Sequence, residues 1–494
     1  MNLSAFIGLI CALWLSTACH GFGYSDHGAR DAFEHSFKAS CYHFSFVHLF
    51  LDIMEREPNN DDRFVIYSFA EHGMGSNGGL GDRLAGLITA SAFALRSGRR
   101  LLITGDAPFR ASFAPYHRSN RKQRDVTLKE VRFDWHNWQW AGWQDAYYSN
   151  MTFVHGCVNP KARNLGCALD GDSSAKLSSF KVVKYRGNRC YLCRWAARPD
   201  PKLQDELLRS LGVRAGTDLY AVAGCLLRLV MWPTDGLWQQ LDEWVSAQDA
   251  SLSSRLTTPV ENSGKRADVL PSMRQISVHF RCGDSSFATT GAGGSVNRQC
   301  VADPTGGVQW RGTSFGDDYS TDSPLDCAAC ARRVAQELQQ MDGTTAVLLY
   351  VASDYGPSSS QINSTARWTP SLAPQESCHV DHTTSTGAHT CAVHTYVQWL
   401  LLSLSDVIVV QSLHKNADPK YAFYSEYSTA TKRMEAELEA LEPGGPVSAF
   451  SRYAYIYGLR DKGLRYGGNC TVANRLALSW QTRGNWMCDN KNFY

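Results

Sequence analysis

Two stretches of this 494-residue chain alternate short apolar strands with helices, and this pattern constrains the fold more than any other feature. In the first stretch, a β-type run at 63–68 leads through the glycine-rich turn 73–83 into an apolar-periodic helix at 84–95 and a strand at 100–104. Strand, glycine-rich turn, helix and strand in this order open a doubly wound parallel sheet. The first stretch therefore predicts a Rossmann-like α/β domain.

The second stretch repeats the alternation without repeating the sequence. It predicts strands at 275–278, 345–352 and 406–410, separated by helices at 323–341 and 394–404. Between the two stretches lie two predicted helices, 217–230 and 236–247, and then a segment rich in Ser, Thr, Pro, Asn and Lys that reads as a linker. We therefore expect an α/β chain with this organisation: a signal peptide or signal anchor at 1–20, an extension without clear period at 21–62, an N-terminal Rossmann-like domain at 63–247, the linker at 248–271, a C-terminal Rossmann-like domain at 272–435, and a segment at 436–494 that packs back on the domains.

The N-terminus and the cysteines favour the secretory pathway. The apolar run Ala5–Thr17 is shorter than a membrane span and fits a signal-peptide core, with a signal anchor or a buried helix as alternatives. Sequons at Asn150, Asn363 and Asn469 and a total of 16 cysteines fit an oxidising lumen, so we expect a Golgi or secreted protein. A net charge of +2 gives no reason to expect a nucleic-acid partner.

The cysteines are expected to form mainly structural disulfides. Two C-x-x-C pairs are too far apart for a zinc finger, and the second falls in a helical pattern, where it is either packed or disulfide-bonded. The pairs are Cys190/Cys193 and Cys327/Cys330, and the neighbours that look like local loop staples are Cys157/Cys167, Cys378/Cys391 and Cys470/Cys488.

Polar residues follow four predicted strands, at the ends where parallel sheets bind ligands. In the first turn, Gly78, Gly79 and Gly81 let backbone N–H groups approach an anion at a helix N-terminus, with Asp82 and Arg83 in the first helical turn. The alternative is a tight turn whose Arg83 binds a carboxylate at the domain interface. The other polar strand ends are 279–284, 353–354 and 411–414, and together the four predict a cleft between two domains.

The segment from His279 to Asp284 is the most specific of these. Strand alternation places Val278 and Phe280 on one face and His279 and Arg281 on the other. A guanidinium at a strand end can bind a diphosphate in bidentate fashion, and His279 could assist it. A buried Arg–Asp pair within the segment is the alternative.

Three motifs together resemble the GDP-fucosyltransferase superfamily, which includes plant cell-wall, rhizobial nodulation, core α1,6- and protein O-fucosyltransferases. They are Gly78–Gly–Leu–Gly–Asp–Arg–Leu84, His279–x–Arg–x–Gly–Asp284 and Val351–Ala–Ser–Asp354, and Cys225–Pro233 resembles the central region of plant-type members. The resemblance spans roughly residues 64 to 435 as ordered motifs. It implies a GT-B-like fold with two Rossmann-like domains facing a cleft, the first on the acceptor side and the second binding the nucleotide sugar. It also implies no required cofactor or metal.

The resemblance assigns roles to individual positions. Arg281 matches the arginine that grips the β-phosphate of GDP, and His279 matches its companion. Asp354 matches the acidic residue that recognises guanine. Ser412 falls near the hydroxyl that contacts phosphate in relatives, although Ser425 and Ser428 could supply that contact instead.

The catalytic base is missing from its expected place. Some relatives carry a glutamate a few residues after the arginine motif, whereas this chain has no carboxylate at 285–290. Asp284, Asp82 and Glu71 remain candidate bases, because a base must reach the acceptor hydroxyl and sequence does not show that. An aromatic cluster has two alternative roles, core packing or the lining of an acceptor groove. Its members considered for the groove are Trp138, Trp140 and Trp143.

These observations favour a metal-independent transfer of fucose from GDP-fucose to a glycan or glycoprotein hydroxyl. Two alternatives keep the fold: a transferase for another nucleotide sugar, and a non-catalytic carbohydrate-binding relative. A third, a metal-dependent transferase, would use the Asp-x-Asp pair at 170–172. The N-terminal apolar run leaves membrane attachment open.

Overall fold

The structure is a computed structural model of the whole chain. It describes residues 28–56, 62–68, 79–104, 107–116, 151–155, 182–186, 208–248, 274–280, 300–302, 308–310, 319–342, 347–353, 371–372, 388–411, 413–415, 449–459, 463–468 and 470–472, together with Leu192, Asp205 and Ile362.

The first sheet has four parallel strands in the order β2-β1-β5-β4. They are β1 (Phe64–Ser68), β2 (Arg100–Thr104), β4 (Met151–His155) and β5 (Val182–Arg186). Helix α4 (Leu80–Arg96) connects β1 to β2 and packs against both strands. The predicted strand–turn–helix–strand unit is therefore confirmed.

The second sheet has five parallel strands in the order β12-β11-β7-β13-β15. They are β7 (Arg274–Phe280), β11 (Val347–Ser353), β12 (Ser371–Leu372), β13 (Val407–Val410) and β15 (Leu464–Tyr466). Strands β11 and β13 are buried at every position, as expected for parallel strands covered on both faces. The α/β class with parallel sheets is confirmed.

Helices cover both faces of the second sheet. On β11, Leu349 and Val351 join the apolar cluster that contains α14 (Pro324–Asp342), whereas Leu348 and Tyr350 join the cluster that contains α16 (Ala388–Leu404). This division follows the two-residue period of a strand, which sends successive side chains to opposite faces.

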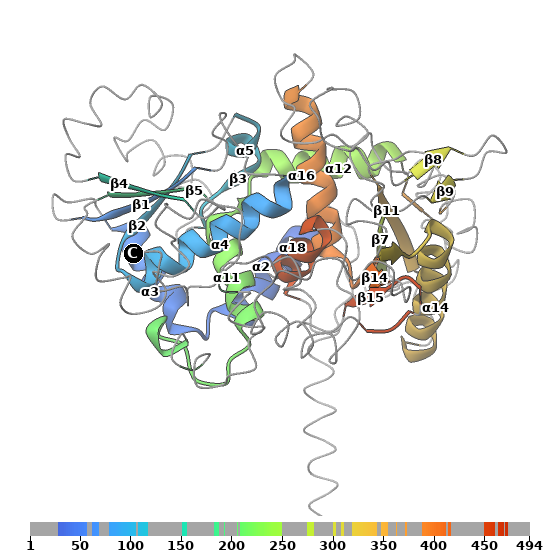
Figure 1. Cartoon of the computed structure of the whole chain (residues 1–494), viewed down its shortest axis with the longest axis horizontal. Helices are drawn as coiled ribbons and strands as arrows, with labels where there is room; N and C mark the ends of the chain where they lie inside the picture. The colour runs from blue at the N-terminus through green and yellow to red at the C-terminus, as the bar shows by residue number, and fades with distance from the viewer. Residues whose placement is uncertain are drawn as a thin grey trace, which may run out of the picture.

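One continuous apolar cluster joins the two sheets. It contains residues of β1 and β11 and of the helices that Figure 1 shows between the sheets, namely α2 (Gly28–Cys41), α11 (Leu219–Val230), α16 and α18 (Ala449–Gly458). Helix α18 packs against α4, α11 and α16. Gly224 permits its close approach to α11, because a Cβ atom there would overlap the Ile456 carbonyl oxygen.

The expectation that residues 21–62 lack regular structure was wrong. Helices α2 and α3 (Ser45–Glu55) lie there, and both pack against α11. The helical signal was present in the sequence, since Phe33, Phe37 and Cys41 recur every fourth residue and are all buried. A disulfide from Cys41 to Cys225 ties α2 to α11.

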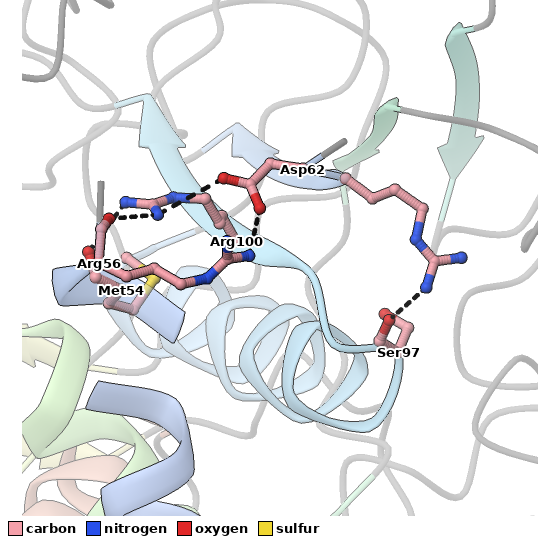
Figure 2. Close-up of polar contacts among 6 residues, drawn as sticks. Met54, Arg56, Asp62, Ser97 and Arg100 are labelled. Carbon is pink, nitrogen blue, oxygen red and sulfur yellow. Dashed lines mark hydrogen bonds and ion pairs between the residues drawn. The ribbon is translucent and has the colours of Figure 1, made fainter. Parts of the chain in front are cut away.

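A buried ion-pair network holds the end of α3 against the first sheet (Figure 2). Asp62 is 3% exposed and binds the guanidinium of Arg56, and Nη1 of Arg100 lies 3.7 Å from Asp62 Oδ2. Arg100 also donates to the carbonyl oxygens of Arg56 (2.6 Å) and Met54 (3.0 Å). Nearby, Arg63 donates to the Ser97 carbonyl at the end of α4. The network fixes α3 relative to β2.

Shorter elements complete the described structure. The predicted helix at 236–247 is α12, which packs against α16. The bounds are α5 (Ala107–Ser112), β3 (Phe113–Ala114), β6 (Trp232–Pro233), α12 (Asp235–Gln248), β8 (Cys300–Ala302), β9 (Val308–Trp310), β10 (Tyr319–Thr321) and β14 (Leu413–Lys415). Within the ranges given above, no helix combines the length and apolar character that crossing a bilayer requires. The leader at 1–20 lies outside these ranges.

Candidate functional site

The carboxyl ends of three adjacent strands meet at one edge of the second sheet. Ala352 on β11 and Val410 on β13 both pair with His279 of β7, and Ser353 pairs with Phe280. The polar residues at these ends are nearly buried: His279 is 8% exposed, Ser353 6% and Gln411 2%. Three of the four predicted strand ends therefore lie at one edge of one sheet, and the predicted cleft between two domains stays a prediction.

The two faces of β7 differ in chemistry. Ile276, Val278 and Phe280 pack into the apolar cluster with α14. On the opposite face, Nε2 of Gln275 donates to Oγ of Ser405 (2.8 Å) and to the Leu401 carbonyl (3.0 Å), both on the α16 side. Ser277 Oγ is hydrogen-bonded to Ser405 Oγ. These bonds satisfy a buried polar row that ends at His279, as buried polar groups require.

The imidazole of His279 is stacked on the ring of Phe450. The ring centroids are 5.3 Å apart and the planes are inclined by 30°. Phe450 lies in the first turn of α18, so the helix that joins the two sheets also orients this histidine. Sequence analysis missed Phe450, because no local pattern links a residue in the last fifty to a strand end in the middle of the chain.

The end of β13 is held by a second contact. Nε2 of Gln411 donates to the backbone carbonyl of Asp322 at 3.2 Å. Next to it, β14 pairs antiparallel with β10, so that His414 lies opposite Ser320. These contacts fix β10 and Asp322, which precede α14, beside the carboxyl edge of the second sheet. The separate sequence motifs did not predict this arrangement.

The glycine-rich turn of the first sheet ends in a helix N-terminus. Gly79 is the N-cap residue of α4, Gly81 is buried in its first turn, and Arg83 is 4% exposed. The phenol of Tyr67 on β1 donates to the Arg83 carbonyl at 2.7 Å, and the Arg83 N–H donates to the Gly79 carbonyl at 3.2 Å. These bonds fix the first turn of α4 after β1, and anion binding by this turn stays a prediction.

Most of the predicted site residues lie outside the described residues, so their roles stay predictions. His279, Gly79, Gly81 and Arg83 are described, and Asp82 is described as a helical residue without its side chain. Those outside are Glu71, Gly78, Trp138, Trp140, Trp143, Asn150, Asp170, Asp172, Arg281, Asp284, Asp354, Asn363, Ser412, Ser425, Ser428 and Asn469. Arg281 and Asp354 each directly follow the last residue of β7 or β11, and Ser412 directly follows Gln411.

The disulfides differ in part from the expected local pairs. Cys470 is bonded to Cys330 of α14, so the expected pair Cys470/Cys488 was wrong. Cys327 is a free buried thiol, so the second C-x-x-C pair is not bonded internally. Local spacing failed here because β15 returns the chain to α14, across 140 residues of sequence. Cys391 is disulfide-bonded, and the pairs at 157/167 and 190/193 lie outside the described residues.

Burial raises the pKa of the Cys327 thiol well above its ordinary value of 9.0. The carboxylates of Asp322 and Asp326 act in the same direction, because each disfavours a second negative charge nearby. The thiol is therefore protonated at neutral pH and is a poor nucleophile.

Comparisons with known proteins were made by sequence and by structure. No protein-family model and no curated protein matches the sequence.

Three solved structures similar to this chain are fucosyltransferases, the group that the motifs resemble. Arabidopsis thaliana FUT1 in complex with GDP has 12% identity and a TM-score of 0.43, covering 90% of this chain and 79% of its own. The fucosyltransferase NodZ from Bradyrhizobium has 13% identity and a TM-score of 0.36, covering 84% and 99%. POFUT1 in complex with GDP-fucose has 12% identity and a TM-score of 0.35, covering 83% and 100%. Scores this low carry no inference about substrate or residues.

Proposed function

We propose that this chain is a glycosyltransferase that transfers fucose from GDP-fucose to a hydroxyl of a glycan or glycoprotein. The observation that carries the proposal is the convergence of three strand ends in the second sheet. Each of them is followed within two residues by a polar residue that the motif resemblance assigns to the donor. These are Arg281 after β7, Asp354 after β11, and Ser412, which follows β13 after Gln411. Ligands of open parallel sheets bind at this edge.

The chemistry follows from where charge develops. When the bond between fucose and diphosphate breaks, negative charge grows on the leaving oxygens. A guanidinium held at the end of β7 stabilises this charge without a metal, most effectively where water is excluded. His279, which is stacked on Phe450 and nearly buried, is the proposed companion of Arg281 in this role. The acceptor proton requires a base, for which Asp284, Asp82 and Glu71 remain candidates.

The proposed donor is GDP-fucose, and Asp354 is the proposed guanine-binding residue. The carboxylate of an aspartate accepts two hydrogen bonds from the N1–H and N2–H₂ edge of guanine, which uracil lacks. Ser412 is the proposed phosphate ligand, with Ser425 and Ser428 as alternatives. The proposed acceptor groove includes Trp138, Trp140 and Trp143.

One feature favours a second candidate, a carbohydrate-binding relative without activity. No carboxylate occupies positions 285–290, where some relatives have their base. Release of GDP from GDP-fucose, measured with EDTA present and with a panel of glycans, separates the two. We expect acceptor-dependent release that Arg281→Ala lowers by about 100-fold or more and that Arg332→Ala, on the exposed face of α14, leaves unchanged. GDP binding without release would support the second candidate, and equal activity of Arg281→Ala would refute the proposed diphosphate role.

A further inference from the structure

A cavity of about 790 Å³ lies between the helices that join the two sheets. Its walls come from the end of α2, the start of α3, the loop before α11, the first turn of α11, and the end of α18. Small-molecule sites in proteins have volumes of about 300–1,000 Å³, so this cavity has the size of a binding site.

The walls are fixed in place by covalent and polar links. The disulfide between Cys41 and Cys225 joins α2 to α11 beside the cavity. The hydroxyl of Ser45 donates to the Gly212 carbonyl and so attaches α3 to the loop. Arg228 donates to the carbonyl oxygens of Tyr457 (2.7 Å) and Gly458 (3.3 Å), which holds the end of α18. The cavity is therefore preformed, as ligand sites usually are.

Three polar groups of the lining can accept hydrogen bonds from a ligand. Thr217 donates its hydroxyl hydrogen to the Arg214 carbonyl at 2.7 Å, and Ser45 donates its own to the Gly212 carbonyl. A hydroxyl that donates in this way can offer only lone pairs to a ligand. Asp218, which caps α11 through its bond from the Tyr220 N–H (2.9 Å), adds a carboxylate. The cavity therefore suits a ligand that carries several O–H donors.

The remaining lining is of mixed character. Arg214 is a cation and Asp218 an anion, so the lining carries one such side chain of each sign besides His43, and Arg214 can donate to the oxygens of a sugar. Apolar surface in the lining comes from the side chains of Phe44, Tyr455 and Ile456. The ring centroids of Phe44 and His43 are 3.9 Å apart. Aromatic surface beside hydroxyl acceptors matches a pyranose ring, which has an apolar face and a rim of hydroxyls.

The cavity is separate from the strand-end site. Helix α18 contacts His279 through Phe450 in its first turn, whereas Tyr455 and Ile456 line the cavity near its other end. From Phe450 to Ile456 the helix advances by six residue steps, or about 9 Å along its axis. The cavity and the carboxyl edge of the second sheet therefore lie toward opposite ends of α18.

We propose that this cavity binds a short neutral oligosaccharide at a second site, distinct from the proposed donor site and independent of any transfer activity. The hydroxyls of the sugar donate to Thr217, Ser45 and Asp218, and its apolar face packs on Phe44. The site holds carbohydrate beside the enzyme without taking part in bond breaking.

The test is binding of chitotetraose, cellotetraose, maltotetraose and xylotetraose to the full chain, by saturation-transfer NMR and calorimetry. We expect at least one to bind, and Ala221→Phe, which fills the cavity from α11, to weaken this binding more than tenfold. Ala329→Phe, the same exchange on the exposed face of α14, should leave it unchanged. Thr217→Val, which removes one acceptor, should weaken it roughly two- to tenfold.

Two parallel measurements keep the outcome decisive. Thermal unfolding and GDP binding of Ala221→Phe report whether the variant folds and whether the donor site is intact, so failure of this proposal and failure of the donor proposal are distinguishable. The proposal is overturned if none of the four oligosaccharides binds, if Ala221→Phe binds as tightly as the unmodified chain, or if tetragalacturonate, an acidic oligosaccharide, binds more tightly than all of them.

Discussion

Arg228 is a charged side chain inside the core, 2% exposed, and its guanidinium donates to backbone carbonyl oxygens. It donates to the carbonyl oxygens of Tyr457, Gly458 and Phe33, and it lies 4.0 Å above the Phe33 ring. The carbonyls of Tyr457 and Gly458 belong to the last turn of α18, where a positive charge is favourable. Arg228 therefore caps α18 and attaches it to α2 and α11.

Replacing Arg228 with Met should destabilise the protein strongly. The variant keeps the length of the side chain but leaves buried carbonyls without their donor, at about 1–3 kcal/mol for each unsatisfied group. We expect a clear fall in the urea midpoint for unfolding. The matched exchange Arg332→Met, on the exposed face of α14, should change the unfolding free energy by less than about 0.5 kcal/mol. Equal midpoints for the two variants would contradict the capping role.

The buried thiol of Cys327 should make the free energy of unfolding fall as the pH rises above about 9. Because the folded state raises the thiol pKa above its ordinary 9.0, the folded chain binds the thiol proton more tightly than the unfolded chain does. Its contribution to stability is therefore complete below about pH 9 and is lost as the pH rises further. We expect Cys327→Ala to show a shallower fall in unfolding free energy above pH 9 than the unmodified chain, measured by urea titration at each pH. Identical slopes would show that the thiol does not titrate differently in the two states.

At the residue scale, the sequence predicted which face of a strand a side chain lies on, but it did not predict contacts between distant segments. Alternation along β7 placed Val278 and Phe280 on the face opposite His279, and the structure agrees. Neither the stacking of Phe450 on His279 nor the capping of α18 by Arg228 was predictable, because both contacts depend on how distant segments fold together. The segment Cys225–Pro233 was singled out for its resemblance alone, and the structure gives Arg228 within it a physical role.

At the scale of elements, α3 and the first sheet are joined by Asp62 rather than by apolar packing alone. The side chains of Asp62 and Arg100 are 2% and 4% exposed, whereas Arg56 is 42% exposed. Two cations therefore share one buried carboxylate, but only one of them is itself buried (Figure 2).

Asp62→Ala should cost about 3–5 kcal/mol, because it removes the buried carboxylate that pairs with both Arg100 and Arg56. Arg56→Met should cost less, since this side chain is partly in water and exposed ion pairs contribute about 0–1 kcal/mol. Chemical unfolding of both variants, beside Asp52→Ala on the exposed face of α3, measures the difference. A larger loss in Arg56→Met than in Asp62→Ala would contradict this ordering.

Five helices and five strands were predictable, because their hydrophobic periods are clear over a few turns or a single strand. The helices at 217–230, 236–247 and 323–341 correspond closely to α11, α12 and α14. The two helices before the first sheet were missed although Phe33, Phe37 and Cys41 follow a helical period. Polar and aromatic residues between them obscured the pattern.

At the scale of the molecule, two parallel sheets share one apolar cluster through α2, α11, α16 and α18. The sequence predicted two α/β units and a C-terminal segment that packs back on them, but it did not predict that α2 and α18 lie with α11 and α16 between the two sheets. Long-range links such as Cys41–Cys225 and Cys330–Cys470 were equally beyond local spacing, since each closes more than 100 residues of chain. The division into domains at 63–247 and 272–435 remains a prediction.

The proposed donor site is a metal-independent GDP site at the carboxyl edge of the second sheet. Its decisive test is titration calorimetry of the full chain with GDP and with UDP, both in EDTA. We expect GDP to bind at least tenfold more tightly than UDP, and Arg281→Ala to lose most of this affinity while Arg332→Ala keeps it. Equal or tighter binding of UDP, or unchanged GDP affinity in Arg281→Ala, would contradict it.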